Sequence, residues 1–288
     1  MGQYISSPKR TSRILSEHGI RLRKRLGQNY IIDTNSIKKM VSLVEIIPGE
    51  TILEIGSGIG SLTEILLESG AGKVVCIEID KKISDIFKDI FSDETREGTV
   101  ELIIGDAMDI DYGRLAAGNN IEKMVSNLPY KIAAPLMLKI LREAHGIKHF
   151  LVTIQKDMAD RLLAKAGDKN YSSYTVKSNL LADYRPGFKI SRNCFMPKPF
   201  VDSAVVGISR RTLPEGFSGN NVIEKFFDLV NNSFLHRRKK LLNSLALSKN
   251  HRIEIDRIAG LLPEIGKNTE VRAQDLSLED YIFLFKNL

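Results

Sequence analysis

The stretch TILEIGSGIGSLTE, from Thr51 to Glu64, decides the fold. It opens with a nearly continuous apolar run, which is typical of a buried parallel strand, and it ends with the spacing of a helix that begins near Ser61. Between the two, Gly56, Gly58 and Gly60 allow the backbone to turn tightly and let a ligand approach its amide groups. The stretch therefore predicts a strand, a ligand-binding turn and a helix.

The same alternation continues along the chain. Apolar runs lie at 73–79, 99–106, 123–128 and 149–155, and segments with helical spacing lie at 81–91, 133–144 and 156–166. Strands that alternate with helices indicate a parallel sheet covered on both faces, so we expect an α/β, doubly wound fold. The later β-branched run SAVVGISRR, 203–211, is expected to close this sheet as an edge strand.

A second domain is expected after Arg211. The stretch TLPEGFSGNN collects Pro, Gly, Ser and Asn, and the residues beyond it have helical spacing without strand signals. We therefore divide the chain into residues 1–212, with a basic N-terminal arm, and a small C-terminal helical domain, 213–288. The helical domain contains the densest basic run, which consists of His236, Arg237, Arg238, Lys239 and Lys240. This run is either a surface for phosphates or a solvated helix face.

Composition narrows the classes of partner. The 288 residues include 42 Lys and Arg against 35 Asp and Glu, and this net charge of +7 favours polyanionic partners. Cys76 and Cys194 are far apart and have no histidine at ligand spacing, so we expect no metal, no disulfide frame and a reducing, cytoplasmic setting. No apolar run approaches the roughly 20 residues of a membrane helix, and no membrane partner is expected.

Polar residues follow the predicted strands. Ser61 occupies the position of the third glycine of a dinucleotide fingerprint, so the turn instead resembles the Gly-x-Gly-x-Gly turn of class I methyltransferases, whose ligand is S-adenosylmethionine. Glu78 follows some twenty residues later, where doubly wound folds present a carboxylate to ribose hydroxyls. Asp106 ends the next strand and could accept a hydrogen bond from an adenine amino group. Three such strand ends define a single crevice.

The tetrad Asn127-Leu128-Pro129-Tyr130 ends the fourth strand. An aromatic amine is a poor nucleophile because its lone pair is delocalised, and two acceptors for its protons favour the pyramidal, nucleophilic form. The side-chain oxygen of Asn127 and the carbonyl of Leu128 can supply these acceptors, and Pro129 has no N–H to compete. Tyr130 offers a ring for stacking on a base. The tetrad therefore predicts a pocket for the exocyclic amine of a nucleobase.

These motifs together resemble the ribosomal RNA adenine dimethyltransferase family, the KsgA-type enzymes of the small ribosomal subunit, with the Erm enzymes of the large subunit as relatives. Matching stretches include RLGQNYIID, LEIGSGIGSLTE, SNLPYKIAAPL, FMPKPFVDSAVV and HRRKKLLNSL, and together they cover almost the whole chain. The resemblance implies a class I methyltransferase (Rossmann-like) sheet that binds S-adenosylmethionine. It assigns the cofactor to Gln28, Asn29, Ile31, Gly56, Gly58, Glu78, Asp106 and Asn127. It also implies that Tyr130 and Phe195 sandwich the target adenine.

The function implied by this resemblance is N6-dimethylation of adenines in small-subunit (16S) ribosomal RNA. Two adjacent adenosines near the 3′ end are the expected targets, in an immature small subunit and with a role in ribosome biogenesis. The resemblance also implies that the basic N-terminal arm belongs to the enzyme itself. A monomeric enzyme is expected. The run from His236 to Lys240 would then bind RNA phosphates.

The chain departs from the family pattern at several positions. Lys131, Ala133 and Ala134 replace polar residues after the tetrad. Tyr30 replaces the usual Phe, and Met196 and Phe200 replace residues that are more typical of the family. These changes bear on rate and site preference and leave the reaction class unchanged. Two alternatives remain: an Erm-like enzyme acting on large-subunit RNA, and an RNA-binding assembly factor without turnover. Ser61 disfavours a third, a nicotinamide dehydrogenase.

Overall fold

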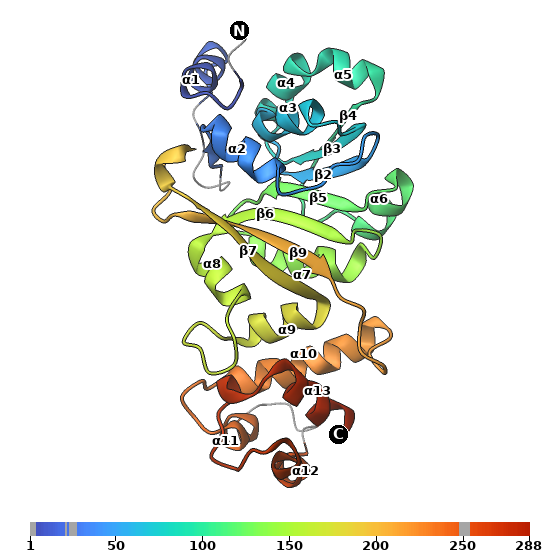
Figure 1. Ribbon diagram of the computed structural model, residues 1–288, viewed down its shortest axis with the longest axis vertical. Coiled ribbons are helices and arrows are strands. Elements are labelled where there is room, and N and C mark those ends of the chain that lie inside the picture. The colour runs from blue at the N-terminus through green and yellow to red at the C-terminus, as the bar shows by residue number, and fades with distance from the viewer. Residues whose placement is uncertain (1–3, 21, 23–27, 248–253) are drawn as a thin grey trace. The chain divides into compact units, whose positions relative to one another are not determined.

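The computed structural model describes residues 4–20, 22, 28–247 and 254–288 (Figure 1). The chain divides into two compact units. The first comprises Met1–Ala159 and Arg185–Arg210, and the second comprises Asp160–Tyr184 and Arg211–Leu288. Residues 21 and 23–27 of the expected basic arm lie outside the described residues.

A seven-stranded sheet organises the first unit, in the order β4-β3-β2-β5-β6-β9-β7 (Figure 1). Its strands are β2 (Thr51–Ile55), β3 (Lys73–Glu78), β4 (Val100–Ile104), β5 (Lys123–Asn127), β6 (His149–Gln155), β7 (Ala182–Ile190) and β9 (Ser203–Arg210). The pairs β2–β3, β3–β4, β2–β5 and β5–β6 are parallel, and β9 is antiparallel to β6. The sequence predicted the five parallel strands, and the mixed sheet matches the expected α/β class.

The expectation that the run from Ser203 closes the sheet was wrong. This run forms β9, which lies between β6 and β7, and β7 is the edge strand. Pro186 and Gly187 interrupt the β7 segment, which therefore carried no strand signal in the sequence. An edge strand tolerates proline because its outward side has no neighbour that needs the missing N–H.

Helices cover the sheet of the first unit. Consecutive residues of β2 from Ile52 to Ile55 are buried, so both faces of the sheet are covered. The helices are α1 (Pro8–Glu17), α2 (Thr34–Val41), α3 (Ser61–Glu68), α4 (Lys81–Ile90), α5 (Ser92–Glu97), α6 (Tyr112–Asn119) and α7 (Ala133–Glu143), and α8 (Lys156–Leu162) follows β6. Glu54 is fully buried under α3, and the Thr63 hydroxyl donates to its Oε2 at 2.6 Å. Burial raises the pKa of Glu54 to about 8.

A short two-stranded ladder pairs a segment near the beginning of the chain with a segment close to β9. β1 (Tyr30–Ile31) is antiparallel to β8 (Phe195–Met196), with Tyr30 opposite Met196 and Ile31 opposite Phe195. The N–H of Ile32 extends the ladder by donating to the carbonyl of Cys194 at 2.8 Å. Residues from distant parts of the sequence are thereby held next to each other.

The second unit is helical. It contains α9 (Ser173–Leu181), α10 (Asn220–Phe234), α11 (Leu241–Ala246), α12 (Ile255–Leu261) and α13 (Leu278–Lys286). Phe217, Phe226 and Phe285 form an aromatic cluster in its core, with ring centroids 5.3–5.5 Å apart. The sequence-based division assigned Asp160–Tyr184 to the first domain, whereas the structure groups them with the C-terminal helices. The reason is packing, because α9 lies against α10 and the Lys177 ammonium donates to Asn231 Oδ1 at 2.9 Å.

In the part of the chain that the structure describes, the helices fall short of the length and apolar character that a bilayer span requires.

Candidate functional site

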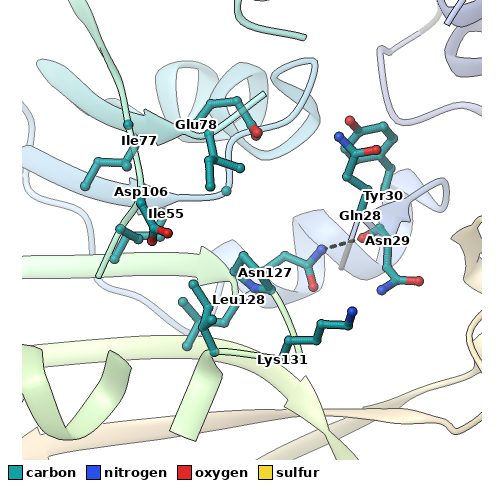
Figure 2. A pocket seen from close by; sticks show the side chains of 16 residues that line it. Gln28, Asn29, Tyr30, Ile55, Ile77, Glu78, Asp106, Asn127, Leu128 and Lys131 are labelled. Carbon is teal, nitrogen blue, oxygen red and sulfur yellow. Dashed lines mark hydrogen bonds between the residues drawn. The ribbon is translucent and has the colours of Figure 1, made fainter. Parts of the chain in front are cut away.

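A cavity of about 170 Å³ lies where β2, β3 and β5 end (Figure 2). Many of the site residues expected from the sequence line it, namely Gln28, Asn29, Gly56, Glu78, Asp106, Asn127 and Leu128. Carboxyl ends of neighbouring parallel strands meet at one edge of a sheet, and such an edge is where doubly wound folds bind ligands. The fold therefore collects these side chains around one space.

The glycine turn between β2 and α3 has a conformation that other residues would strain. Gly56 and Gly58 have φ angles of 75° and 58°. A Cβ on Gly56 would lie 3.2 Å from Pro129, and a Cβ on Gly58 would lie 2.4 Å from the ring of Tyr30. Glycine is needed at both positions, because of the left-handed backbone and because of the close neighbours. Gly56 itself lines the cavity, whereas Gly58, also expected to bind the cofactor, is not among the lining residues.

Glu78 is held rigidly at the end of β3. Its side chain is buried, its Oε2 accepts from the N–H of Gly58 at 3.0 Å, and its Oε1 accepts from the N–H of Asp80 at 2.9 Å. Burial raises the pKa of Glu78, and the backbone hydrogen bonds oppose that shift. Each carboxylate oxygen has two lone pairs, so the group can still accept from sugar hydroxyls. The carboxylate is thus both an anchor of the glycine turn and a wall of the cavity.

Asp106 and two apolar residues form another part of the cavity wall. Oδ1 of Asp106 accepts from the N–H of Met108 at 2.8 Å, which fixes the turn after β4. Ile79, which is 44% exposed, and Ala107 line the cavity beside it. Sequence reasoning missed these two, although an isoleucine directly after the acidic end of a strand was a usable signal. Apolar walls next to a carboxylate and a glycine turn fit an adenosyl group.

The side-chain amide of Asn127 has a hydrogen-bonded nitrogen and an oxygen that is available as an acceptor. Its Nδ2 donates to the carbonyl of Asn29 at 2.7 Å, as Figure 2 shows. Its Oδ1 is shielded from solvent and has no hydrogen-bond partner among the residues that the structure describes. The N–H of Leu128 donates to the carbonyl of Thr153 at 3.1 Å, so β6 anchors the backbone that follows. A buried acceptor without a partner costs free energy and indicates a group that a ligand completes.

Tyr130 lines a second cavity, of about 190 Å³. The other residues around it are Asn29, Lys131, Gln155, Pro197, Lys198, Pro199 and Phe200. The Tyr130 hydroxyl shares a hydrogen bond with the hydroxyl of Ser203 on β9. Asn29 and Lys131 line both cavities, so the two spaces adjoin. Sequence reasoning noticed Lys131 and Phe200 as departures but did not place them in the site.

Ile31 and Phe195 line neither of these two cavities. They pair across the β1–β8 ladder and belong to the hydrophobic core, where Ile31 is 3% exposed and Phe195 is 2% exposed. The expected stacking face of Phe195 is therefore covered by core packing in this arrangement. Its role and that of Ile31 stay predictions.

The predicted phosphate-binding run lies after α10 in the second unit, and all five of its residues are exposed. Arg237 Nε donates to Gln274 Oε1 at 3.0 Å, and Lys240 pairs with Glu270 at 2.6 Å. Among the described residues there is no group of three or more His, Cys, Asp or Glu side chains that could hold a metal ion.

Comparisons with known proteins match the chain to ribosomal RNA methyltransferases. The family model described as "Ribosomal RNA adenine dimethylase" matches residues 19–286. A "Ribosomal RNA small subunit methyltransferase A" from Pelotomaculum thermopropionicum is 34% identical over 96% of this chain and 95% of its own. The crystal structure of a dimethyladenosine transferase from Plasmodium falciparum aligns with a TM-score of 0.70 and 26% identity, over 88% of this chain and 94% of that one.

The structure of the 23S rRNA methyltransferase ErmE is also similar, with a TM-score of 0.64 over 89% of this chain and 98% of that one. At 23% identity, it supports the fold alone.

Proposed function

Because the chain belongs to the ribosomal RNA adenine dimethylase family, we propose that it is an S-adenosylmethionine-dependent enzyme that dimethylates N6 of adenines in small-subunit ribosomal RNA. Its relatives named as small-subunit methyltransferases support this choice over an Erm-like activity. Two adjacent adenosines near the 3′ end of the 16S RNA are the proposed targets.

The observation that carries the proposal is the unpartnered, buried Oδ1 of Asn127. One of the two Nδ2 hydrogens is held by the carbonyl of Asn29, which orients the amide and leaves its Oδ1 available as an acceptor for a ligand. An exocyclic amine that donates one proton to this oxygen and one to the carbonyl of Leu128 can direct its lone pair away from both. This nitrogen then becomes a better nucleophile.

The protein's contribution is mainly positioning. S-adenosylmethionine, when bound, supplies an electrophilic methyl group on a positively charged sulfur. Glu78 would accept from the ribose and Asp106 from the adenine amino group, with Gly56, Gln28 and Asn29 around the rest of the cofactor. Asn127 would hold the target amine in line with the methyl group, where correct placement accounts for a large part of the rate. Tyr130 would stack on the target base from the adjoining cavity.

The test of this function is methyl transfer from labelled S-adenosylmethionine to immature small subunits of a strain that lacks its own small-subunit adenine dimethyltransferase. Label should appear in the small-subunit RNA and, after nuclease mapping, in dimethylated adenines near its 3′ end. Label in large-subunit RNA would instead identify an Erm-like enzyme. Binding without any label would identify an assembly factor without turnover.

We assign RNA binding outside the pocket to the C-terminal helical region, 213–288, and specifically to the run from His236 to Lys240. The physiological substrate would be an immature small subunit, the enzyme a monomer that needs no metal, and its place of action the cytoplasm, where ribosomal subunits mature.

Replacing Arg238 and Lys239 by alanine should weaken RNA binding and reduce its salt dependence. Each lost phosphate contact lowers the slope of log K against log salt by about 0.7–0.9, so the double variant should lose about 1.5 in total. Filter binding or fluorescence anisotropy across a salt series measures this. The double variant Lys88→Ala/Arg96→Ala, on α4 and α5, is the matched control for charge. An unchanged slope would mean that the run is a solvated surface.

A further inference from the structure

Phe200 is the most exposed large apolar side chain that the structure describes, with 87% of its surface accessible. It follows Met196-Pro197-Lys198-Pro199 in the segment that joins β8 to β9. A single exposed apolar residue is common on protein surfaces and needs no explanation by itself. Its location in the molecule makes this one informative.

Phe200 lines the second cavity together with Tyr130. These two aromatic residues come from different parts of the first unit, Tyr130 from the end of β5 and Phe200 from the segment before β9. Asn29 and Lys131 connect this cavity to the cofactor cavity. A polynucleotide whose target base reached Asn127 past Tyr130 would therefore have its neighbouring nucleotide close to Phe200.

The backbone beneath Phe200 is fixed although its side chain is exposed. Arg192 Nη1 donates to the carbonyl of Phe200 at 3.2 Å. The N–H of Arg192 donates to Asp202 at 2.9 Å, and Asp202 also pairs with Lys189 at 2.7 Å. Pro197 and Pro199 restrict the chain further. A platform that is rigid before binding loses little conformational entropy when a ligand stacks on it.

The charges around the cavity favour a polyanion. Lys131 and Lys198 are exposed and line the cavity, whose lining includes no Asp or Glu. Gln155 adds an amide that can donate and accept. An aromatic ring with cations beside it is the combination that binds single-stranded nucleic acids, because bases stack on the ring while cations neutralise phosphates.

We propose that Phe200 stacks on the base of a nucleotide adjacent to the target adenine, with Lys198 and Lys131 beside the phosphates of that strand. The inference rests on the proposed function and adds a positioning residue to it. Stacking does not depend on base identity, so Phe200 contributes affinity for the single-stranded segment and does not read its sequence. It takes no part in the methyl transfer itself.

The test compares Phe200→Ala and Phe200→Trp with the wild-type protein, in full-length form and on immature small subunits. In the alanine variant, the KM for the RNA substrate should rise about 5- to 100-fold, as expected for one lost base stack. Its kcat at saturating RNA should stay within about twofold of wild type, because the lost contact is made equally before and during the reaction. The tryptophan variant should restore the KM.

Two measurements separate the possible failures. Leu43→Ala removes an exposed apolar side chain, 52% accessible, that does not line the cavity, and it should leave the KM unchanged. Calorimetric binding of S-adenosylmethionine should be the same in all variants, which shows that they are folded. An unchanged KM in active Phe200→Ala, or a loss confined to kcat, overturns the stacking role. A wild-type protein that methylates no ribosomal RNA overturns the proposed function instead.

Discussion

Replacing Asn127 by alanine is expected to lower kcat for methyl transfer about 100- to 1,000-fold, the size of effect that follows loss of one preorganised polar contact with a reacting group. The variant loses the Oδ1 acceptor that is proposed to direct the amine lone pair. The rate should be measured in single turnovers with saturating RNA and cofactor, so that substrate binding does not mask the chemical step.

Two comparisons make the Asn127 experiment specific. Asn127→Asp keeps an acceptor oxygen but removes the donor to the carbonyl of Asn29, so it tests whether the orientation of the group matters as well as its chemistry. Asn193→Ala alters an exposed asparagine that lines neither cavity and should have no effect. Wild-type rates in Asn127→Ala would remove Asn127 from the mechanism.

Replacing Glu78 by alanine should weaken the binding of S-adenosylmethionine about 10- to 100-fold. A hydrogen bond to a charged group is worth about 1.5–3 kcal/mol, and tenfold in affinity corresponds to about 1.4 kcal/mol. The variant also loses the acceptor that holds the N–H of Gly58, so the glycine turn should loosen. Calorimetry with S-adenosylmethionine and S-adenosylhomocysteine, without RNA, isolates this step.

The control for Glu78 is Asp85→Ala, which removes an exposed carboxylate from α4 and should leave affinity unchanged. The affinity of Glu78→Gln, which retains one acceptor oxygen, should lie between those of the wild type and Glu78→Ala. Burial raises the pKa of Glu78, so its carboxylate becomes protonated at a higher pH than an ordinary glutamate. As the pH falls, the affinity of the wild-type protein for S-adenosylmethionine should therefore begin to decline at that higher pH. Equal affinities for wild type and Glu78→Ala would exclude a cofactor contact.

The parallel strands β2, β3, β5 and β6 could be predicted because they are buried on both faces and appear in the sequence as apolar runs. The edge strand β4 is mostly half-buried but is also rich in apolar residues. β7 could not, since most of its residues are exposed or half-buried and Pro186 breaks its pattern. The break between the units was visible near Arg211, but the helix α9 before β7 gave no local sign that it packs with α10.

The site residues at strand ends followed from topology alone. Glu78 and Asn127 end two parallel strands and Asp106 lies two residues after a third, so their meeting around one cavity needed no long-range information. Gln28 and Asn29 were predicted only from the family resemblance, because the β1–β8 ladder that positions them joins remote segments. For the same reason the sequence did not reveal that Phe195 is covered and Phe200 is exposed.

The β1–β8 ladder also sets the order in which this enzyme can be completed during its synthesis. Strands β2 to β6 are finished early, but the carbonyl that orients the Asn127 amide belongs to Asn29, and Asn29 precedes a strand whose partner is Phe195–Met196. A nascent chain that has not yet reached Met196 lacks the partner strand of β1, the strand that directly follows Asn29. We therefore expect the proposed methyl-transfer site to be completed only after Met196 has been synthesised.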